Sequence, residues 1–157
     1  MQNIDVLAQT ILPRSLHGIN PRSIMGNSEW NKQKKKVQQE AGNHCMICND
    51  YVSHMPGDYL ECHEIYEIDV AKREFSLKGL ICICMKCHEF IHHGRLARLV
   101  AERKITKSYY EQIMIRGNDL LANSGLKKQN LPPEEIRNPD WYLLYNGKKY
   151  SVSKGGE

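Results

Sequence analysis

The chain has 157 residues, about the length of one domain, and its 41% hydrophobic and 25% charged residues are ordinary for a globular protein. Twenty-two Lys and Arg against 18 Asp and Glu give a formal net charge of +4, too small to indicate a nucleic-acid partner by itself. No run approaches the ~18 consecutive apolar residues of a membrane span, and the N-terminus lacks the pattern of a signal peptide. We therefore expect a soluble, cytoplasmic protein with no membrane partner.

Residues 1–27 contain two prolines and two glycines and only one short apolar stretch, residues 4–12, that could form a helix. We expect this segment to be an arm packed on the domain. Ser28 is a good N-cap and Gly42 can end a helix, so the sequence predicts a helix over residues 29–41. This helix carries four lysines, which form either a solvated face or a phosphate-binding face: Lys32, Lys34, Lys35 and Lys36.

Two β-prone runs follow, residues 59–68 and 75–83, and the polar residues 69–74 between them predict two antiparallel strands. Residues 85–104 have helical spacing, with Gly94 as a candidate interruption. A further helix is expected over residues 107–123, with Thr106 and Ser108 as cap candidates.

Residues 126–157 begin with a linker that has three prolines between positions 132 and 139. Asn146-Gly147 then lies between two β-prone runs, which predicts a C-terminal β-hairpin with a type I′ turn. The last five residues are expected to be frayed. The chain thus divides into an arm (1–27), a domain with flanking helices (28–125), and the linker with its hairpin (126–157).

Four of the six cysteines form two Cys-x-x-Cys pairs, Cys45/Cys48 and Cys84/Cys87, with 35 residues between the pairs. Lasting disulfides are unusual in a cytosolic chain, whereas four thiolates complete a closed tetrahedron around Zn²⁺. A closed site leaves no position for water, so the predicted zinc is structural. The alternative is four reduced cysteines in a core. The two cysteines outside the pairs, Cys62 and Cys82, are interpreted as small buried hydrophobic residues.

Three of the seven histidines form a second candidate group. His88 follows Cys87, and His92 lies four residues later, on the same face of a helix. His63 can supply a third ligand if its strand lies against that helix. Three protein ligands leave open positions for water and a phosphate oxygen, as in a catalytic metal site. The alternative is a set of partly exposed histidines with no ion.

The segment 45–92 resembles the zinc-containing branch of the HNH, or ββα-metal, endonucleases. The resemblance rests on C45-M-I-C48, on L60-E-C-H63-E64-I65, and on L80-I-C-I-C84-M-K-C87-H88-E-F-I-H92. It extends more loosely, through the flanking residues, to a subgroup of small bacterial and phage proteins with a His-Glu version of the motif. The resemblance implies an α+β fold: a zinc-stapled ββα-metal core with flanking helices and a C-terminal β-hairpin. It also implies that His63, His88 and His92 hold a catalytic divalent ion, Mg²⁺, Mn²⁺, Ni²⁺ or Zn²⁺, in addition to the structural Zn²⁺.

The chain departs from the family pattern at two positions. Glu64 stands where the family has the general-base histidine, and Gly79 stands where it has the asparagine that orients this base. A carboxylate is ionised at neutral pH and can accept a proton, although it is a weaker base than imidazole unless burial raises its pKa. Glu64 is thus expected to act as a base or an added ligand. A second register, with Cys62 as ligand and His63 as base, ranks lower because it disturbs the spacing to the downstream ligands.

The leading hypothesis is a metal-dependent DNA endonuclease that hydrolyses phosphodiesters, with Arg95 and Arg98 joining the lysines of the 29–41 helix at the phosphates. The alternative is a catalytically degenerate HNH fold of a phage or mobile element that binds DNA or inhibits a host protein. A third possibility is a purely structural zinc domain within a complex. The sequence indicates neither an oligomeric state nor an identified protein partner.

Overall fold

The computed structural model describes residues 3–152, and it has the mixed α+β class expected from the sequence. Its helices are α1 (Ile4–Ala8), the 3₁₀ helix η1 (Arg14–Leu16), α2 (Pro21–Met25), α3 (Asn27–Ala41), α4 (Met85–Ile91), α5 (His93–Ala101), α6 (Lys107–Asn123) and α7 (Pro133–Ile136). Its strands are β1 (Leu60–Asp69), β2 (Glu74–Cys84), β3 (Tyr142–Tyr145) and β4 (Lys148–Tyr150), which form one sheet in the order β1-β2-β3-β4. None of the described helices is long and apolar enough to span a membrane.

The chain forms two compact units, and the long strands β1 and β2 contribute residues to both. The first unit comprises the described part of Met1–Ile11 together with Glu40–His63 and Cys82–Asn130. The second comprises Leu12–Gln39, Glu64–Ile81 and the described part of Leu131–Glu157. Both Cys-x-x-Cys pairs and the three candidate histidines belong to the first unit.

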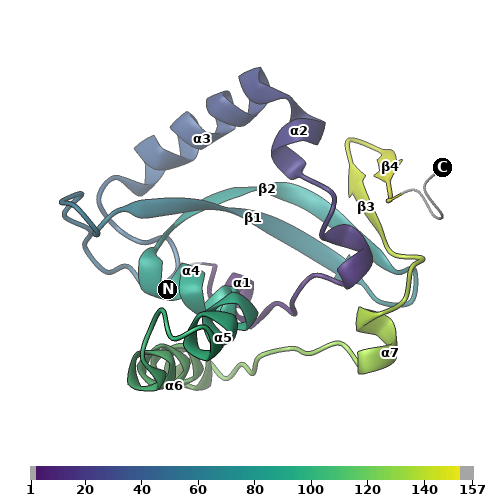
Figure 1. Ribbon diagram of the computed structural model, residues 1–157. Coiled ribbons are helices and arrows are strands. Elements are labelled where there is room, and N and C mark those ends of the chain that lie inside the picture. The colour runs from purple at the N-terminus through teal and green to yellow at the C-terminus, as the bar shows by residue number, and fades with distance from the viewer. Residues whose placement is uncertain (1–2, 153–157) are drawn as a thin grey trace. The chain divides into compact units, whose positions relative to one another are not determined.

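The first unit is built around α4, which packs against α1, α5 and α6 (Figure 1). Phe90 of α4 is fully buried, and its ring lies directly over Gly117 of α6. A side chain at position 117 would occupy the space of this ring, so the glycine allows the two helices to approach closely. This close packing fixes the helix that begins at the second cysteine pair.

The second unit has a core around Trp141, whose buried ring contacts the ring of Phe75 at a centroid distance of 5.4 Å. The indole Nε1 donates a hydrogen bond to the carbonyl oxygen of Glu135, 2.8 Å away. Strand β3 pairs in parallel with β2 and antiparallel with β4. Between β3 and β4, Asn146 and Gly147 have φ values of 51° and 75°, the left-handed conformation that a type I′ turn requires.

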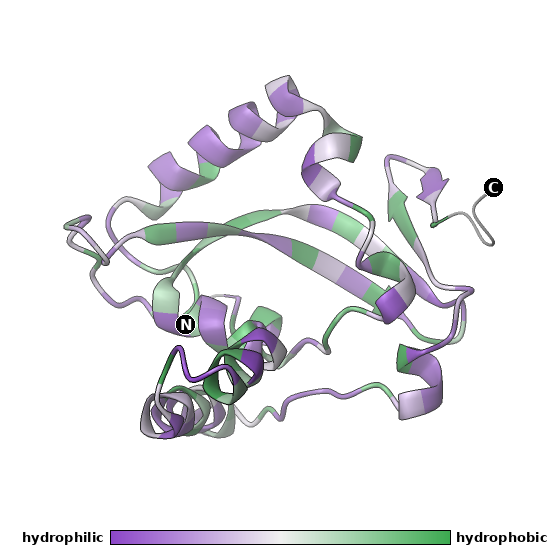
Figure 2. Cartoon of the chain, in the orientation of Figure 1, coloured by the Kyte–Doolittle hydropathy of each residue, from purple (hydrophilic) through white to green (hydrophobic). Residues whose placement is uncertain are grey.

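Several element boundaries differ from those expected. Helix α3 begins at Asn27, so Ser28 lies inside its first turn and is not the N-cap. Most of α3 is hydrophilic (Figure 2). The predicted linker contains the short helix α7, which begins with Pro133, because a proline at the first helical position lacks only an N–H that would be unpaired anyway. The tail expected to fray, residues 153–157, lies outside the described residues.

The predicted helix over 85–104 is divided at His92 and not at Gly94. His92 has φ −96° and ψ 41°, so the chain leaves the helical conformation there, although its N–H still bonds to the carbonyl oxygen of His88. The helix expected over 107–123 is confirmed as α6. Its N-cap is Thr106, whose Oγ1 accepts from the backbone N–H of Tyr109 at 3.1 Å, while Ser108 lies within the helix.

Candidate metal centres

The four paired cysteines converge on one point. Cys45 and Cys48 lie in the turn after α3, Cys84 ends β2, and Cys87 lies in the first turn of α4. Their sulfur atoms are all within 4.8 Å of one another, and the Sγ atoms of Cys48 and Cys84 are 3.8 Å apart. Four sulfurs placed about 2.3 Å from a tetrahedral Zn²⁺ are about 3.8 Å from each other. The group therefore has the dimensions of a four-thiolate zinc site.

The backbone around Cys45 is arranged for a thiolate. The N–H groups of Ile47 and Cys48 point at the Cys45 sulfur, at 3.4 and 3.5 Å. The N–H of Met46 donates to the carbonyl oxygen of Cys82 at 2.9 Å, which attaches this turn to β2. Cys45 is 2% exposed, so these N–H groups, rather than water, would stabilise a thiolate there.

The cluster needs a cation to hold four thiolates. Hydrogen bonds from Cys48, and then from Cys84 and Cys87, lower the pKa of Cys45, whereas the hydrogen bond to Cys45 raises the pKa of Cys87 well above that of a free thiol. The four thiols therefore cannot all ionise independently in this cluster. A divalent ion takes the place of their protons when all four ionise.

Arg116 of α6 contributes a fixed positive charge that sequence reasoning missed. Its Nη1 donates to the Cys87 sulfur at 3.5 Å, and its Nη2 donates to Oδ2 of Asp50 at 3.0 Å. The side chain therefore links α6 both to a candidate zinc ligand and to the turn that carries the first pair. No local pattern signals this role, because Arg116 is 29 residues from Cys87 along the chain.

The three candidate histidines also converge, as the sequence predicts. His63 comes from β1, His88 from α4, and His92 from the break between α4 and α5. Each offers a ring nitrogen within 4.8 Å of the others, and the ring centroids are 4.6 to 5.6 Å apart. His63 is 5% exposed, whereas His92 is exposed. The group can therefore hold an ion that stays accessible from the His92 side.

Burial and the neighbouring positive charge both favour the neutral form of the histidine rings. Burial lowers the pKa of His63 to about 3. His92 has an accessible side, but its ring lies against those of His63 and His88, and this partial desolvation lowers its pKa to about 4; the neighbouring rings add to both shifts. The positive charge of Lys128 acts in the same direction on both rings. Neutral imidazole is the form that binds a metal ion, so the rings are in the required state at neutral pH.

Lys128 is a second residue that sequence reasoning missed. Burial lowers its pKa to about 8, and its Nζ donates to the carbonyl oxygen of Leu7 at 3.3 Å and lies 5.1 Å from the centre of the Phe90 ring. No carboxylate is among the partners described for this amine. A half-buried cation beside neutral histidines is suited to an anionic ligand such as a phosphate.

Two carboxylates flank His63 on β1. Successive side chains of a strand point to opposite faces, so Glu61 shares the face of His63 and Glu64 belongs to the other. The electrostatic neighbours agree: the charge of Glu61 acts on His92, and that of Glu64 acts on Tyr66. Burial raises the pKa of Glu64, which makes it a stronger base. The catalytic role of Glu64 stays a prediction, and Glu61 is an additional candidate.

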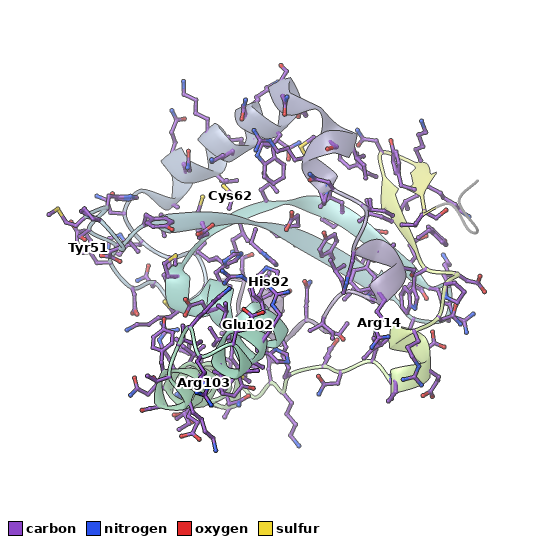
Figure 3. All side chains as sticks on the ribbon, in the orientation of Figure 1. Arg14, Tyr51, Cys62, His92, Glu102 and Arg103 are labelled. Atoms are coloured by element: carbon purple, nitrogen blue, oxygen red, sulfur yellow. The ribbon has the colours of Figure 1, made fainter. Side chains whose placement is uncertain are left out.

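Cys62 lies apart from the histidine group. Its Sγ is 3.7 Å from that of Cys82, and in Figure 3 Cys62 and His92 lie on opposite sides of the strands. Among the described residues, the metal-ligating groups are the four cysteines and the three histidines alone. The register with Cys62 as a ligand therefore has no support from the geometry.

The predicted phosphate-binding residues are divided between the two units. Arg95 and Arg98 lie exposed on α5 in the unit that carries the histidines, and Arg98 Nε is 3.9 Å from Oε1 of Glu102. The four lysines of α3 are exposed and belong to the other unit. Their role at phosphates stays a prediction.

Comparison of the chain with protein-family models, with curated proteins and with solved structures finds no match. The resemblance to the HNH endonucleases therefore rests on the motif residues themselves.

Proposed function

We propose that the protein is a metal-dependent DNA endonuclease of the HNH type, with a zinc-stapled ββα-metal core. The observation that carries the proposal is the second group: three histidine nitrogens from β1, α4 and the α4–α5 break lie within 4.8 Å of one another beside a four-cysteine group. A structural zinc site is closed, whereas three ligands with an accessible side are typical of a catalytic ion.

The chain offers two sets of ligands with different chemistry, one for each of two ions. Four thiolates favour Zn²⁺, which stabilises the fold and has no position for water. His63, His88 and His92 would hold a divalent ion that, when bound, acts as a Lewis acid on a phosphodiester. The imidazole set suits Zn²⁺ and Ni²⁺, and a partly hydrated Mg²⁺ or Mn²⁺ is the alternative.

The remaining roles belong to charged side chains. A carboxylate accepts a proton from the attacking water: the motif predicts Glu64, and Glu61, which shares the strand face of His63, is the alternative. Arg95, Arg98 and Lys128 hold phosphate oxygens through contacts that carry no sequence information. Binding is therefore expected to weaken steeply with salt and to differ little between unrelated duplexes.

The second candidate function is a binding module with the same fold and no turnover. The observation that favours it is the altered motif: Glu64 stands in place of the family's base histidine, and Gly79 has no side chain to orient a base. Such a protein would bind DNA or a protein partner through the same surfaces.

A plasmid assay separates the two. The zinc-loaded full chain is incubated with supercoiled DNA and added Mg²⁺, Mn²⁺, Ni²⁺ or Zn²⁺, and nicking is expected with at least one of them. His92→Ala should abolish nicking and keep the structural zinc. His54→Asn is the matched control, because His54 is an exposed histidine of the same unit and its positive φ of 60° is one that Asn tolerates. DNA binding without nicking under every ion supports the binding module instead.

A further inference from the structure

A pair of cysteines lies outside both metal groups. Cys62 of β1 and Cys82 of β2 have their Sγ atoms 3.7 Å apart. Cys82 is fully buried and Cys62 is half-buried. The four-cysteine and three-histidine groups include neither residue.

The geometry of neighbouring strands suits a bond between these sulfurs. Strands β1 and β2 are hydrogen-bonded neighbours in the sheet, and neighbouring strands lie about 4.8 Å apart, within the range of Cα separations, about 4.4 to 6.8 Å, that a disulfide joins. The two sulfurs are already in van der Waals contact, and the bond needs an approach to about 2.05 Å. Side-chain rotation can supply most of that movement without a change in the backbone.

Along the chain, each cysteine of the pair is close to a residue of one metal group. Cys62 immediately precedes His63, and Cys82 lies two residues before Cys84. The backbone of Cys82 is held by Met46, through Met46 N–H to the Cys82 carbonyl oxygen at 2.9 Å and Cys82 N–H to the Met46 sulfur at 3.4 Å. A bond between the cysteines would therefore join the strand that carries His63 to the strand attached to the four-cysteine group.

We propose that Cys62 and Cys82 are a modification site that forms a reversible disulfide by exchange with a low-molecular-weight disulfide. The Cys62 thiolate attacks one sulfur of the reagent and releases one thiolate, which leaves a mixed disulfide on Cys62. The Cys82 thiolate then attacks the Cys62 sulfur and releases the second thiolate. Two protein thiols and one small disulfide thus give one protein disulfide and two small thiols.

The different burial of the two sulfurs sets the order of these steps. Cys62 is half-buried and accessible to a small reagent, whereas Cys82 is 0% exposed and its sulfur lies 3.7 Å from that of Cys62. Cys62 is therefore the attacking residue and Cys82 the resolving residue. Both metal groups are expected to survive, because the four paired cysteines hold their own ion and Cys62 points to the strand face opposite His63.

The test uses the zinc-loaded full chain and oxidised glutathione. After exposure, remaining thiols are blocked with N-ethylmaleimide, and the protein is digested with trypsin and an endoproteinase that cleaves before Asp. Cleavage before Asp58 separates Cys62 from the first cysteine pair, cleavage after Lys86 separates Cys82 from Cys87, and fragmentation across Ile83 distinguishes Cys82 from Cys84. The expected product is a Cys62–Cys82 link that dithiothreitol reverses, formed with no loss of zinc.

Two variants test the order of attack, and neither touches a metal group. Cys82→Ser should accumulate glutathione on Cys62, because nothing resolves the mixed disulfide. Cys62→Ser should leave Cys82 unmodified. The proposal is overturned if the wild-type protein stays reduced, if it keeps glutathione on Cys62 without forming the link, or if Cys62 links to Cys84 with release of zinc. These outcomes do not depend on whether the protein cleaves DNA.

Discussion

Gly117→Ala tests the packing that holds the metal-binding helix. A Cβ atom at position 117 would overlap three ring carbons of Phe90, Cγ, Cδ2 and Cε2, at separations that real Cβ atoms essentially never show. The ring is 0% exposed, so it can move aside only by displacing other core side chains or by separating α4 from α6.

The magnitude follows from two opposing effects. Replacing glycine with alanine within a helix stabilises it by about 1 kcal/mol, and overpacking a core costs about 1 to 3 kcal/mol, occasionally more. Because the overlap involves three atoms of a buried ring, we expect the second effect to dominate, with a net loss of about 2 kcal/mol. For a chain of this size, that loss lowers the melting temperature by about 4 to 8 °C.

The assay is chemical and thermal unfolding of the zinc-loaded protein, with Gly94→Ala as the matched control. Gly94 also lies in a helix, but a Cβ there would meet no atom within 4 Å, so this variant should be neutral or up to about 1 kcal/mol more stable. Phe90→Leu shortens the side chain that the new methyl group meets. Its loss of unfolding free energy should therefore be smaller in the Gly117→Ala background than in the wild-type protein, with a coupling energy of at least about 1 kcal/mol. Equal stability of Gly117→Ala and Gly94→Ala would refute the close approach of α4 and α6.

Three further predictions concern charged side chains near the metal groups. Lys128→Met should stabilise the protein by up to about 3 kcal/mol at pH 7, because burial lowers the lysine pKa from 10.5 to about 8 and the folded state therefore bears the cost of the charge below pH 8. The advantage should shrink between pH 8 and 10.5 as the wild-type amine deprotonates, and the same change in stability at pH 7 and at pH 10 would contradict it. Glu61→Gln should weaken ion binding at the histidines about tenfold in isothermal titration, as for other carboxylates around metal ligands. Glu64→Gln should keep ion affinity and, if Glu64 is the base that the motif predicts, lower nicking ~10²-fold; full nicking by Glu64→Gln with loss of nicking by Glu61→Gln would assign the base to Glu61, which shares the strand face of His63. Arg116→Leu should lower the free energy of unfolding by about 1 to 3 kcal/mol and speed zinc transfer to a chelator, because it removes a charged hydrogen bond to a thiolate. The control Arg98→Leu, at an exposed ion pair, should change the free energy of unfolding by less than about 1 kcal/mol.

The convergence of the four cysteines and of the three histidines could be predicted because it depends on local spacing. Each Cys-x-x-Cys pair brings two sulfurs together within one turn, and a spacing of four residues brings His88 near His92 even though the helix ends between them. The N-cap at Thr106 and the turn at Asn146-Gly147 are equally local. Such features need no knowledge of the rest of the chain.

The features that could not be predicted depend on contacts between distant segments. The break lies at His92, where ψ is 41°, and Gly94, the residue that the sequence indicates as the interruption, lies inside α5. Arg116 reaches the cysteine group, and Lys128 reaches the Phe90 ring, only after α6 has packed on α4. The alternation of Glu61 and Glu64 between the faces of β1 is local, but which of these faces lies at the histidine group depends on the packing of β1 near α4.

The most direct test of the two-centre account is metal stoichiometry by native mass spectrometry, with Co²⁺ absorption as a second readout. Zinc-loaded wild-type protein should carry one tightly held Zn²⁺ and bind one additional Co²⁺ with a spectrum of nitrogen and oxygen ligands. His92→Ala should keep the Zn²⁺ and lose the Co²⁺, whereas Cys84→Ser should lose the Zn²⁺ and unfold the surrounding region, because metal binding at such a site contributes roughly 10 kcal/mol or more of folding free energy. A wild-type protein that binds no second ion, or a His92→Ala variant that binds Co²⁺ as the wild type does, would contradict the account.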